Sequence, residues 1–144
     1  MIINIKTLNL TEDRYNEIIE LYSIFSKIDK NILTICSLKT LIKNLAKNHH
    51  ILFYTKGDKI IGAITLLIEQ KIIHNGKCVG HIEDFAVLEE YRSLGIGSLL
   101  LEHAIILSRQ NNCYKCILDC SPSIEGYYLK KGFANKGTYM GLYF

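Results

Sequence analysis

The stretch Tyr91–Leu100, YRSLGIGSLL, places two glycines one residue apart in front of a run of leucines. The residues before it are apolar in a strand pattern, and those after it keep helical spacing to about Gln110. A glycine turn in this position is either a plain structural turn or a cradle for an anion. In a cradle, free backbone N–H groups and the positive end of the helix dipole would hold the anion. The spacing alone leaves both interpretations open.

The residues around this turn exclude two better-known phosphate loops. No Gly-Lys-Ser/Thr sequence follows, so the turn is not a Walker loop. Gly97 is followed by Ser98, Leu99 and Leu100 with no third glycine, so the turn is not a dinucleotide fingerprint. Arg92 adds positive charge, which favours an anionic small molecule of another kind.

The composition is that of a chain able to build its own core. Of the 144 residues, 49% are hydrophobic and 22% are charged, far from the range of disordered proteins. We expect a single domain over residues 1–144. The net charge of +3 comes from scattered lysines and gives little support to nucleic-acid binding. No apolar run is long enough to span a bilayer and no signal-peptide pattern is present, so we expect a cytoplasmic protein without a membrane segment.

Five cysteines raise the question of metal or redox chemistry. Cys113 and Cys116 have CxxC spacing, but no second pair and no HxxxH partner accompanies them. We therefore expect no metal, and we interpret the cysteines as buried, reduced thiols that take no part in chemistry.

The apolar periodicity predicts the element order β-α-α-β-β-β-α-β-α-β, with helices on both sides of a mixed sheet. Thr11 and Ser37 are the expected starts of the first two helices. Asn75-Gly76 is expected to form a turn between two strands. The predicted strands cover 2–8, 50–55, 59–70, 77–87, 114–120 and 136–143, and the later helices cover 95–110 and 123–131.

Acidic residues interrupt the apolar strands at two places. Glu83 and Asp84 are adjacent, and in a regular strand they would point to opposite faces, so only a bulge could aim both into one site. The alternative is that both acids face water at a strand end. Asp119 ends the next predicted strand, where open α/β sheets bind ligands, or else caps a helix together with Ser121 and Ser123.

An aromatic pair, Tyr127-Tyr128, lies on the short helix that follows. Such pairs serve either the core or a site, and the sequence alone does not separate the two roles. Gly132, after two lysines, is expected to end this helix. Of the histidines, His74 and His81 are the better candidates for contact with a ligand because they flank the central hairpin.

Together these segments resemble the GNAT superfamily of N-acetyltransferases. Its signature [Q/R]-x-x-G-x-[G/A] is matched by Arg92, Gly95 and Gly97. Within roughly residues 60–133, the segments KIIH, GHIED, CYKCILDC and YYLKKGF further resemble the glucosamine 6-phosphate N-acetyltransferase family in order and spacing. The resemblance implies an α/β (α+β) fold with a central mixed, mostly antiparallel twisted sheet of six or seven strands and about four helices.

The resemblance also implies acetyl-CoA as co-substrate and direct acetyl transfer to an amine. Backbone N–H groups from Ser93 to Ser98 would hold the pyrophosphate, and the pantetheine arm would lie along the strand before the turn. The fourth and fifth strands would be splayed to admit it. The implied cofactor-binding residues are Phe85, Ala86, Val87, Arg92, Ser93, Leu94, Gly95, Ile96, Gly97, Ser98, Asp119 and Tyr128.

For catalysis, the resemblance implies that Glu83, directly or through water, accepts the amine proton. Tyr128 would protonate the departing thiolate, and Asp119 would help to place the amine. A backbone N–H of the strand at residues 85–87 would stabilise the thioester oxygen. The substrate implied is glucosamine 6-phosphate, for UDP-N-acetylglucosamine synthesis. Its implied contacts are Lys71, Ile72, Ile73, His74, Glu83, Asp84, Tyr114, Lys115 and Tyr143.

The chain departs from that family at two places. Ser123-Ile124 stands where asparagine is common, and Tyr143 stands where relatives carry an arginine that binds the sugar phosphate. The resemblance also implies a homodimer with pockets shared across the interface and the final strand reaching toward the partner.

Two alternative functions remain beside this one. An acetyltransferase of the same fold could act on another amine, such as a polyamine, an arylalkylamine or a protein N-terminus. A catalytically silent CoA-binding module is the other alternative, and the presence of both Glu83 and Tyr128 argues against it.

Overall fold

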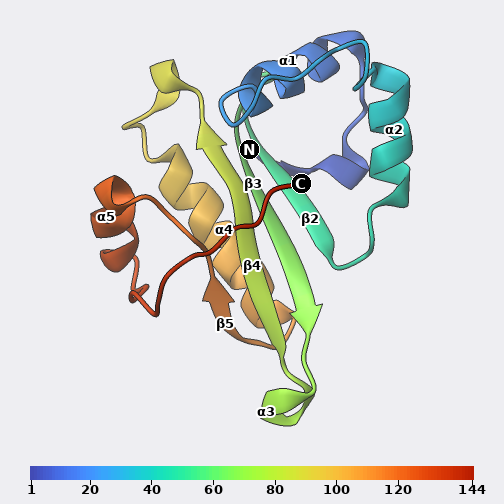
Figure 1. The fold of residues 1–144 in the computed structure, drawn as a ribbon. Helices are drawn as coiled ribbons and strands as arrows, with labels where there is room; N and C mark the ends of the chain where they lie inside the picture. Colours follow the sequence, from blue (N-terminus) through green and yellow to red (C-terminus); the bar gives the residue numbers. More distant parts are fainter.

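A five-stranded sheet forms the centre of the computed structural model, which describes residues 1–144 (Figure 1). The strands lie in sequence order, and all neighbours are antiparallel except the last pair, which is parallel. The strands are β1 (Ile2–Asn4), β2 (His49–Lys56), β3 (Lys59–Gln70), β4 (Cys78–Val87) and β5 (Cys113–Ile117). The sheet is therefore mixed and mostly antiparallel, as predicted.

The central strand β3 is the most apolar part of the chain and the most deeply buried. Ile60, Ile61, Ala63, Ile64 and Leu66 are all inaccessible to solvent. Helices cover both faces of this strand, so its side chains need not alternate between apolar and polar residues, and the sequence shows a continuous apolar run. Its burial makes β3 the core of the domain.

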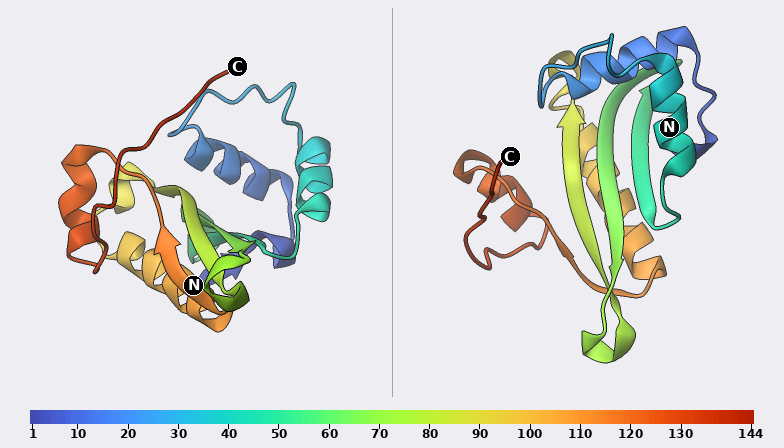
Figure 2. Two further views of the ribbon diagram at one scale, coloured as in Figure 1. Left: turned by 60° about the horizontal axis from the view of Figure 1, so that its bottom comes forward. Right: turned by 45° about the vertical axis from the view of Figure 1, so that its right-hand side comes forward.

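One face of the sheet is covered by α1 (Glu12–Tyr22), with α2 (Ile35–Asn44) beside it (Figure 2). The Thr11 hydroxyl accepts a hydrogen bond from the N–H of Arg14, and this cap starts α1 as predicted. The second helix begins three residues earlier than predicted, because Thr34 rather than Ser37 caps it. A carboxylate oxygen of Glu17 accepts a hydrogen bond from the N–H of Ile60, which ties α1 to the start of β3.

The other face is covered by α4 (Ile96–Gln110), and α5 (Glu125–Leu129) follows β5 (Figure 2). Between β3 and β4, α3 (Ile73–Gly76) is a single distorted turn in which His74, Asn75 and Gly76 all have positive φ. Three short 3-10 turns complete the chain: η1 (Ile5–Thr7), η2 (Glu89–Tyr91) and η3 (Pro122–Ile124). None of the helices combines the length and the apolar character needed to cross a membrane.

One predicted strand is shorter than expected and another does not form, so the sheet has five strands instead of six or seven. The first ends at Asn4, whose side chain caps a 3-10 turn over the rest of the predicted 2–8 segment. The closing strand at 136–143 does not form, because its backbone makes no hydrogen bond to a sheet edge. The tail is exposed and lies away from the sheet instead of running along β5 (Figure 2). Periodicity identifies a segment able to form a strand, but a strand also needs a neighbour to pair with.

The cysteines are unpaired, but none of them is fully buried. Cys36 is exposed on α2, and Cys78, Cys113, Cys116 and Cys120 are partly buried around β5. The expectation of buried thiols was therefore wrong in this respect, because β5 lies at the edge of the sheet. No group of three or more His, Cys, Asp or Glu side chains is arranged to hold a metal ion.

Gly80 sets how closely α4 can pack against the sheet. A Cβ atom at this position would lie 2.6 Å from the Ser108 hydroxyl oxygen, which itself bonds to the Ala104 carbonyl. We expect Gly80→Ala to lower the free energy of unfolding by about 1–3 kcal/mol, since an extra carbon in a packed contact forces strain. Adding Ser108→Ala should recover part of the loss. Urea denaturation of both variants measures this, and full stability in Gly80→Ala alone would contradict it.

Candidate active site

The glycine turn forms a group of free backbone donors at the start of α4. Gly95 is the N-cap residue with φ of 79°, and Ser93 also has a positive φ of 64°. The N–H groups of residues 93–98 donate to no backbone acceptor in the chain. These donors lie at the positive end of a 15-residue helix, an arrangement that favours an anion.

A cavity opens directly at this turn. Two β4 side chains, Phe85 and Val87, and Tyr127 of α5 line it together with the turn itself. The residues from the turn and its approach are Tyr91, Arg92, Ser93, Gly95, Ile96, Gly97 and Ser98. We call this the cradle cavity. A Cβ atom at Gly97 would lie 3.3 Å from the Phe85 ring, so a larger residue at this position would crowd the cavity.

A β-bulge in β4 answers the question raised by the adjacent acids. Ala63 pairs with Ala86, and Thr65 pairs with Glu83. Two residues of β4, Asp84 and Phe85, therefore lie opposite one residue of β3, Ile64. Asp84 has a φ of 44°, a left-handed conformation that aspartate tolerates better than most residues. The bulge breaks the strict alternation of side chains, but it does not bring both acids into one cavity, because Glu83 lines the larger cavity described below and Asp84 lines neither cavity.

Strands β4 and β5 part beside the bulge. Their parallel pairing ends at His81 and Ile117, while β4 continues to Val87 (Figure 1). Beyond His81, β4 therefore has an edge that β5 does not pair. The splayed strands that the resemblance implied are present in the structure.

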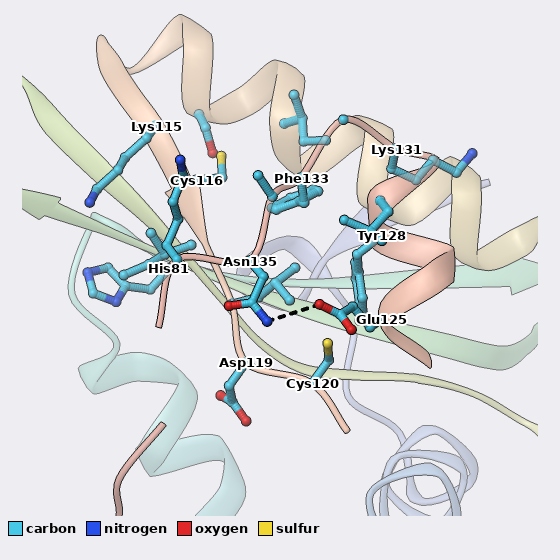
Figure 3. A pocket seen from close by; sticks show the side chains of 18 of the residues that line it. His81, Lys115, Cys116, Asp119, Cys120, Glu125, Tyr128, Lys131, Phe133 and Asn135 are labelled. Atoms are coloured by element: carbon cyan, nitrogen blue, oxygen red, sulfur yellow. Dashed lines mark hydrogen bonds between the residues drawn. The ribbon is translucent and has the colours of Figure 1, made fainter. Parts of the chain in front are cut away.

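A second, larger cavity of about 900 Å³ lies along β5 and the segment after it (Figure 3). Glu83 of β4, Asp119 and Cys120 after β5, and Tyr128 of α5 all line it. We call this the acidic cavity. The 3.0 Å hydrogen bond from the Asn135 side-chain amide to Glu125 joins α5 to the following loop at its wall (Figure 3).

The two candidate proton-transfer groups in this cavity have shifted pKa values. Partial burial, followed by the charges of Asp119 and Asp84, raises the pKa of Glu83. Burial first, and then neighbouring Tyr127, Cys120 and Asp119, raise the pKa of Tyr128 to about 12. Glu83 therefore holds a proton more readily than an ordinary glutamate, and Tyr128 keeps its proton at neutral pH.

Basic and aromatic side chains lie near the end of this cavity where β4 begins. Lys115 lines the cavity and has no ion-pair partner, and its amine lies 5.5 Å from the centre of the Tyr114 ring. His74, from the distorted turn α3, stacks against Tyr114 with ring centroids 4.0 Å apart. Segments distant in sequence thus meet at one end of β5.

His81 also lines the acidic cavity and is held by Glu69 on the neighbouring strand. The His81 Nε2 atom lies 2.7 Å from one carboxylate oxygen of Glu69, and the Lys71 amine lies 2.5 Å from the other. The hydrogen bond from Lys71, and then that of His81, lower the pKa of Glu69. Lys71, which follows β3, is therefore paired with Glu69 near the end of that strand.

The structure gathers most of the predicted site residues around the two cavities, but not all of them. Ala86 is buried and Leu94 is 60% exposed outside the cradle cavity. Ile72 and Ile73 protrude at the tip of the β3–β4 connection, with Ile72 97% exposed. Tyr143 is 90% exposed in the tail and lines neither cavity. The sequence did not single out Cys120, Tyr127 or Phe133 as cavity residues. The repeated aromatic character of YYLKKGF was the available signal.

The match to a protein family agrees with this geometry. The family model described as "Acetyltransferase (GNAT) family" matches residues 16–135. The chain belongs to this family. GNAT enzymes use acetyl-CoA as co-substrate, which is consistent with an anion cradle beside parted strands.

Several relatives of this GNAT chain are named as glucosamine 6-phosphate N-acetyltransferases. A Candida albicans protein named glucosamine 6-phosphate N-acetyltransferase is 32% identical over 138 residues, which cover 94% of this chain and 91% of that protein. A rice protein named probable glucosamine 6-phosphate N-acetyltransferase 2 is 37% identical over 87 residues, 60% of this chain. That alignment spans 52% of the rice protein, so this chain matches about half the length of that relative. The solved glucosamine-6-phosphate N-acetyltransferase of Arabidopsis thaliana superposes with a TM-score of 0.83 at 27% identity, covering 100% of this chain and 97% of that one.

The raised pKa of Glu83 predicts a pH-dependent effect on stability. A carboxyl that binds its proton more tightly in the folded chain than in the unfolded chain destabilises the fold when it ionises. Glu83→Gln removes that ionisation. The variant should therefore melt at a higher temperature than the wild type at neutral pH, and the difference should shrink as the pH falls below about 4, the ordinary range for glutamate. Thermal unfolding at both pH values tests this, and a difference independent of pH would contradict it.

Proposed function

We propose that this chain transfers the acetyl group of acetyl-CoA to the amine of glucosamine 6-phosphate, as one catalytic domain over residues 1–144 acting in the cytoplasm. The observation that carries the proposal is the placement of Glu83, Asp119 and Tyr128 in one cavity where β4 and β5 part, close to the glycine cradle. The names of the relatives in rice and Candida albicans supply the substrate.

The residues at the cradle fit the phosphate-bearing end of acetyl-CoA. The free N–H groups of residues 93–98 suit a pyrophosphate, and Gly97 keeps the cavity open where a Cβ atom would meet Phe85. Arg92 adds a positive charge, with its Nε bonded to the Val87 carbonyl. The unpaired edge of β4 beyond His81 then offers main-chain groups to the pantetheine arm. Acetyl-CoA supplies the acetyl group as a thioester, which is activated for attack by an amine.

Glu83 accepts the proton that the sugar ammonium must lose before its nitrogen can attack. Its raised pKa improves its proton affinity, since the efficiency of a general base rises as its pKa approaches the working pH. Asp119, which lines the same cavity, helps to place the amine, and the nearby charge of Asp84 adds to the attraction of the ammonium. The new bond joins the sugar nitrogen to the acetyl carbon, the carbon–sulfur bond breaks, and the nitrogen releases its second proton, which restores the Tyr128 hydroxyl after that group has protonated the sulfur.

Tyr128 donates a proton to the sulfur that leaves. Its pKa of about 12 keeps the hydroxyl protonated at neutral pH, so a donor is available for each turnover. The aromatic contacts of its ring with Tyr127 and Phe133, at 5.1 and 5.8 Å between centroids, hold it in position. Such packing keeps a catalytic group preorganised.

The sugar phosphate binds at the basic and aromatic end of the acidic cavity. Lys115 is the best-placed cation because it is unpaired, whereas the Lys71 amine is bonded to Glu69. Tyr114 and His74 supply the neighbouring polar contacts. The exposed tail with Tyr143 reaches the pocket of a second copy in a homodimer, and Ile72 and Ile73 are covered at the same time.

A different amine substrate is the alternative, and the acidic lining of the larger cavity favours it. Glu83, Asp119 and Glu125 line the cavity with no arginine from the tail, so a polyamine would also be attracted. The two substrates make opposite demands on Lys115, which attracts a phosphate and repels a cation.

The deciding experiment measures CoA release from acetyl-CoA with glucosamine 6-phosphate, glucosamine and spermidine. The proposal requires a strong preference for the phosphorylated sugar and the loss of that preference in Lys115→Met. Turnover of spermidine above that of the sugars would establish the alternative. No release with any of the three amines would refute both substrate assignments.

The role of Tyr128 gives a further prediction. Tyr128→Phe removes the proton donor but keeps the aromatic packing, so kcat should fall by about 100- to 10,000-fold. The dissociation constant of CoA, measured by calorimetry, should stay close to that of the wild type. Unchanged turnover would remove Tyr128 from the mechanism.

A further inference from the structure

The hydroxyl group of Tyr127 is buried and bonds to no protein atom. Its neighbour Tyr128 has an assigned role, but nothing in the reaction above uses Tyr127. An unpaired buried hydroxyl is unfavourable by about 1–3 kcal/mol, and phenylalanine would provide the same ring without this penalty. The hydroxyl therefore requires an explanation other than packing.

Its position relates it to the cradle. Tyr127 lines the cradle cavity, and its oxygen lies 3.6 Å from the point that a Cβ atom of Gly97 would occupy. The Phe85 ring approaches the same point at 3.3 Å. The hydroxyl thus lies where β4 meets the first turn of α4, between the expected course of the pantetheine arm and the free N–H groups.

The ring of Tyr127 is held on its other sides, so the position of the oxygen is well defined. It makes an edge contact with Tyr128 at 5.1 Å between centroids, and the Lys131 amine lies 5.9 Å from its centre. Phe85 and Tyr127 are both partly buried. The Phe85 ring belongs to β4, along which the pantetheine arm is expected to run.

We propose that Tyr127 is a cofactor-binding residue whose hydroxyl donates a hydrogen bond to CoA where the pantetheine arm joins the pyrophosphate. The inference rests on the proposed use of acetyl-CoA. Entry of the arm along β4 rotates the Phe85 ring away from Gly97 and uncovers the hydroxyl. The donor left unpaired in the free chain then gains an acceptor oxygen, so the penalty of its burial is relieved on binding.

The test compares Tyr127→Phe with Tyr22→Phe as a matched control. Both variants delete one buried tyrosine hydroxyl and keep the ring, but Tyr22 lies on α1 and does not line the cradle cavity. Calorimetry gives the dissociation constant of CoA for each, and thermal unfolding gives the stability of each chain without ligand. We expect Tyr127→Phe to weaken CoA binding by about threefold to tenfold, the loss of one hydrogen bond. Its melting temperature without ligand should be equal to or above that of the wild type.

Each outcome separates this inference from the proposed function. Wild-type affinity in Tyr127→Phe would overturn the inference alone. Weaker binding together with a lower melting temperature would make the hydroxyl structural and overturn it as well. An equal loss of CoA affinity in Tyr22→Phe would show that the effect is not specific to the cradle. A wild-type chain that binds no CoA would refute the proposed function first.

Discussion

The site depends on the early end of the pairing between β4 and β5. Buried backbone N–H and C=O groups need partners, and a complete parallel ladder would supply them from within the sheet. Here the ladder stops at His81 and Ile117, while β4 continues to Val87. The chain after β5 turns away toward α5, which places Asp119 and Tyr128 opposite the free edge. Both cavities exist because this pair of strands separates.

The separation also concentrates negative charge. Glu83, Asp84 and Asp119 lie close enough for the two aspartates to raise the pKa of Glu83. Like charges gathered in this way destabilise the empty chain, and a bound cationic amine would relieve their repulsion. At the cradle, the unpaired hydroxyl of Tyr127 is likewise unfavourable until a ligand binds. In both places the free chain holds polar groups in an arrangement that suits a ligand better than it suits the chain alone.

The sequence predicted the parts of the fold that depend on local chemistry. The strand, glycine turn and helix around Tyr91–Leu100 follow from apolar spacing and two glycines, and the Thr11 cap from one hydroxyl. The closing strand at 136–143 was wrong because pairing depends on a neighbouring strand, which the tail's own periodicity does not reveal. From the sequence, a bulge could be stated as the condition for aiming both acids into one site. It could not be predicted, since it depends on the register of β4 with β3. The sequence left Tyr127 open between a core and a site role, because only the packing shows that its hydroxyl is unpaired.

Asp84 contributes two separate properties to the site, a left-handed backbone conformation and a negative charge. Its φ of 44° maintains the shape of the bulge, and its carboxylate contributes to the charge around Glu83. Asparagine and glycine also tolerate this backbone conformation, whereas β-branched residues do not. Substitution at this position is therefore restricted by geometry to a few residues, while the charge among them is free to change. Related chains could thus adjust the charge beside Glu83 without rebuilding the strand that carries it.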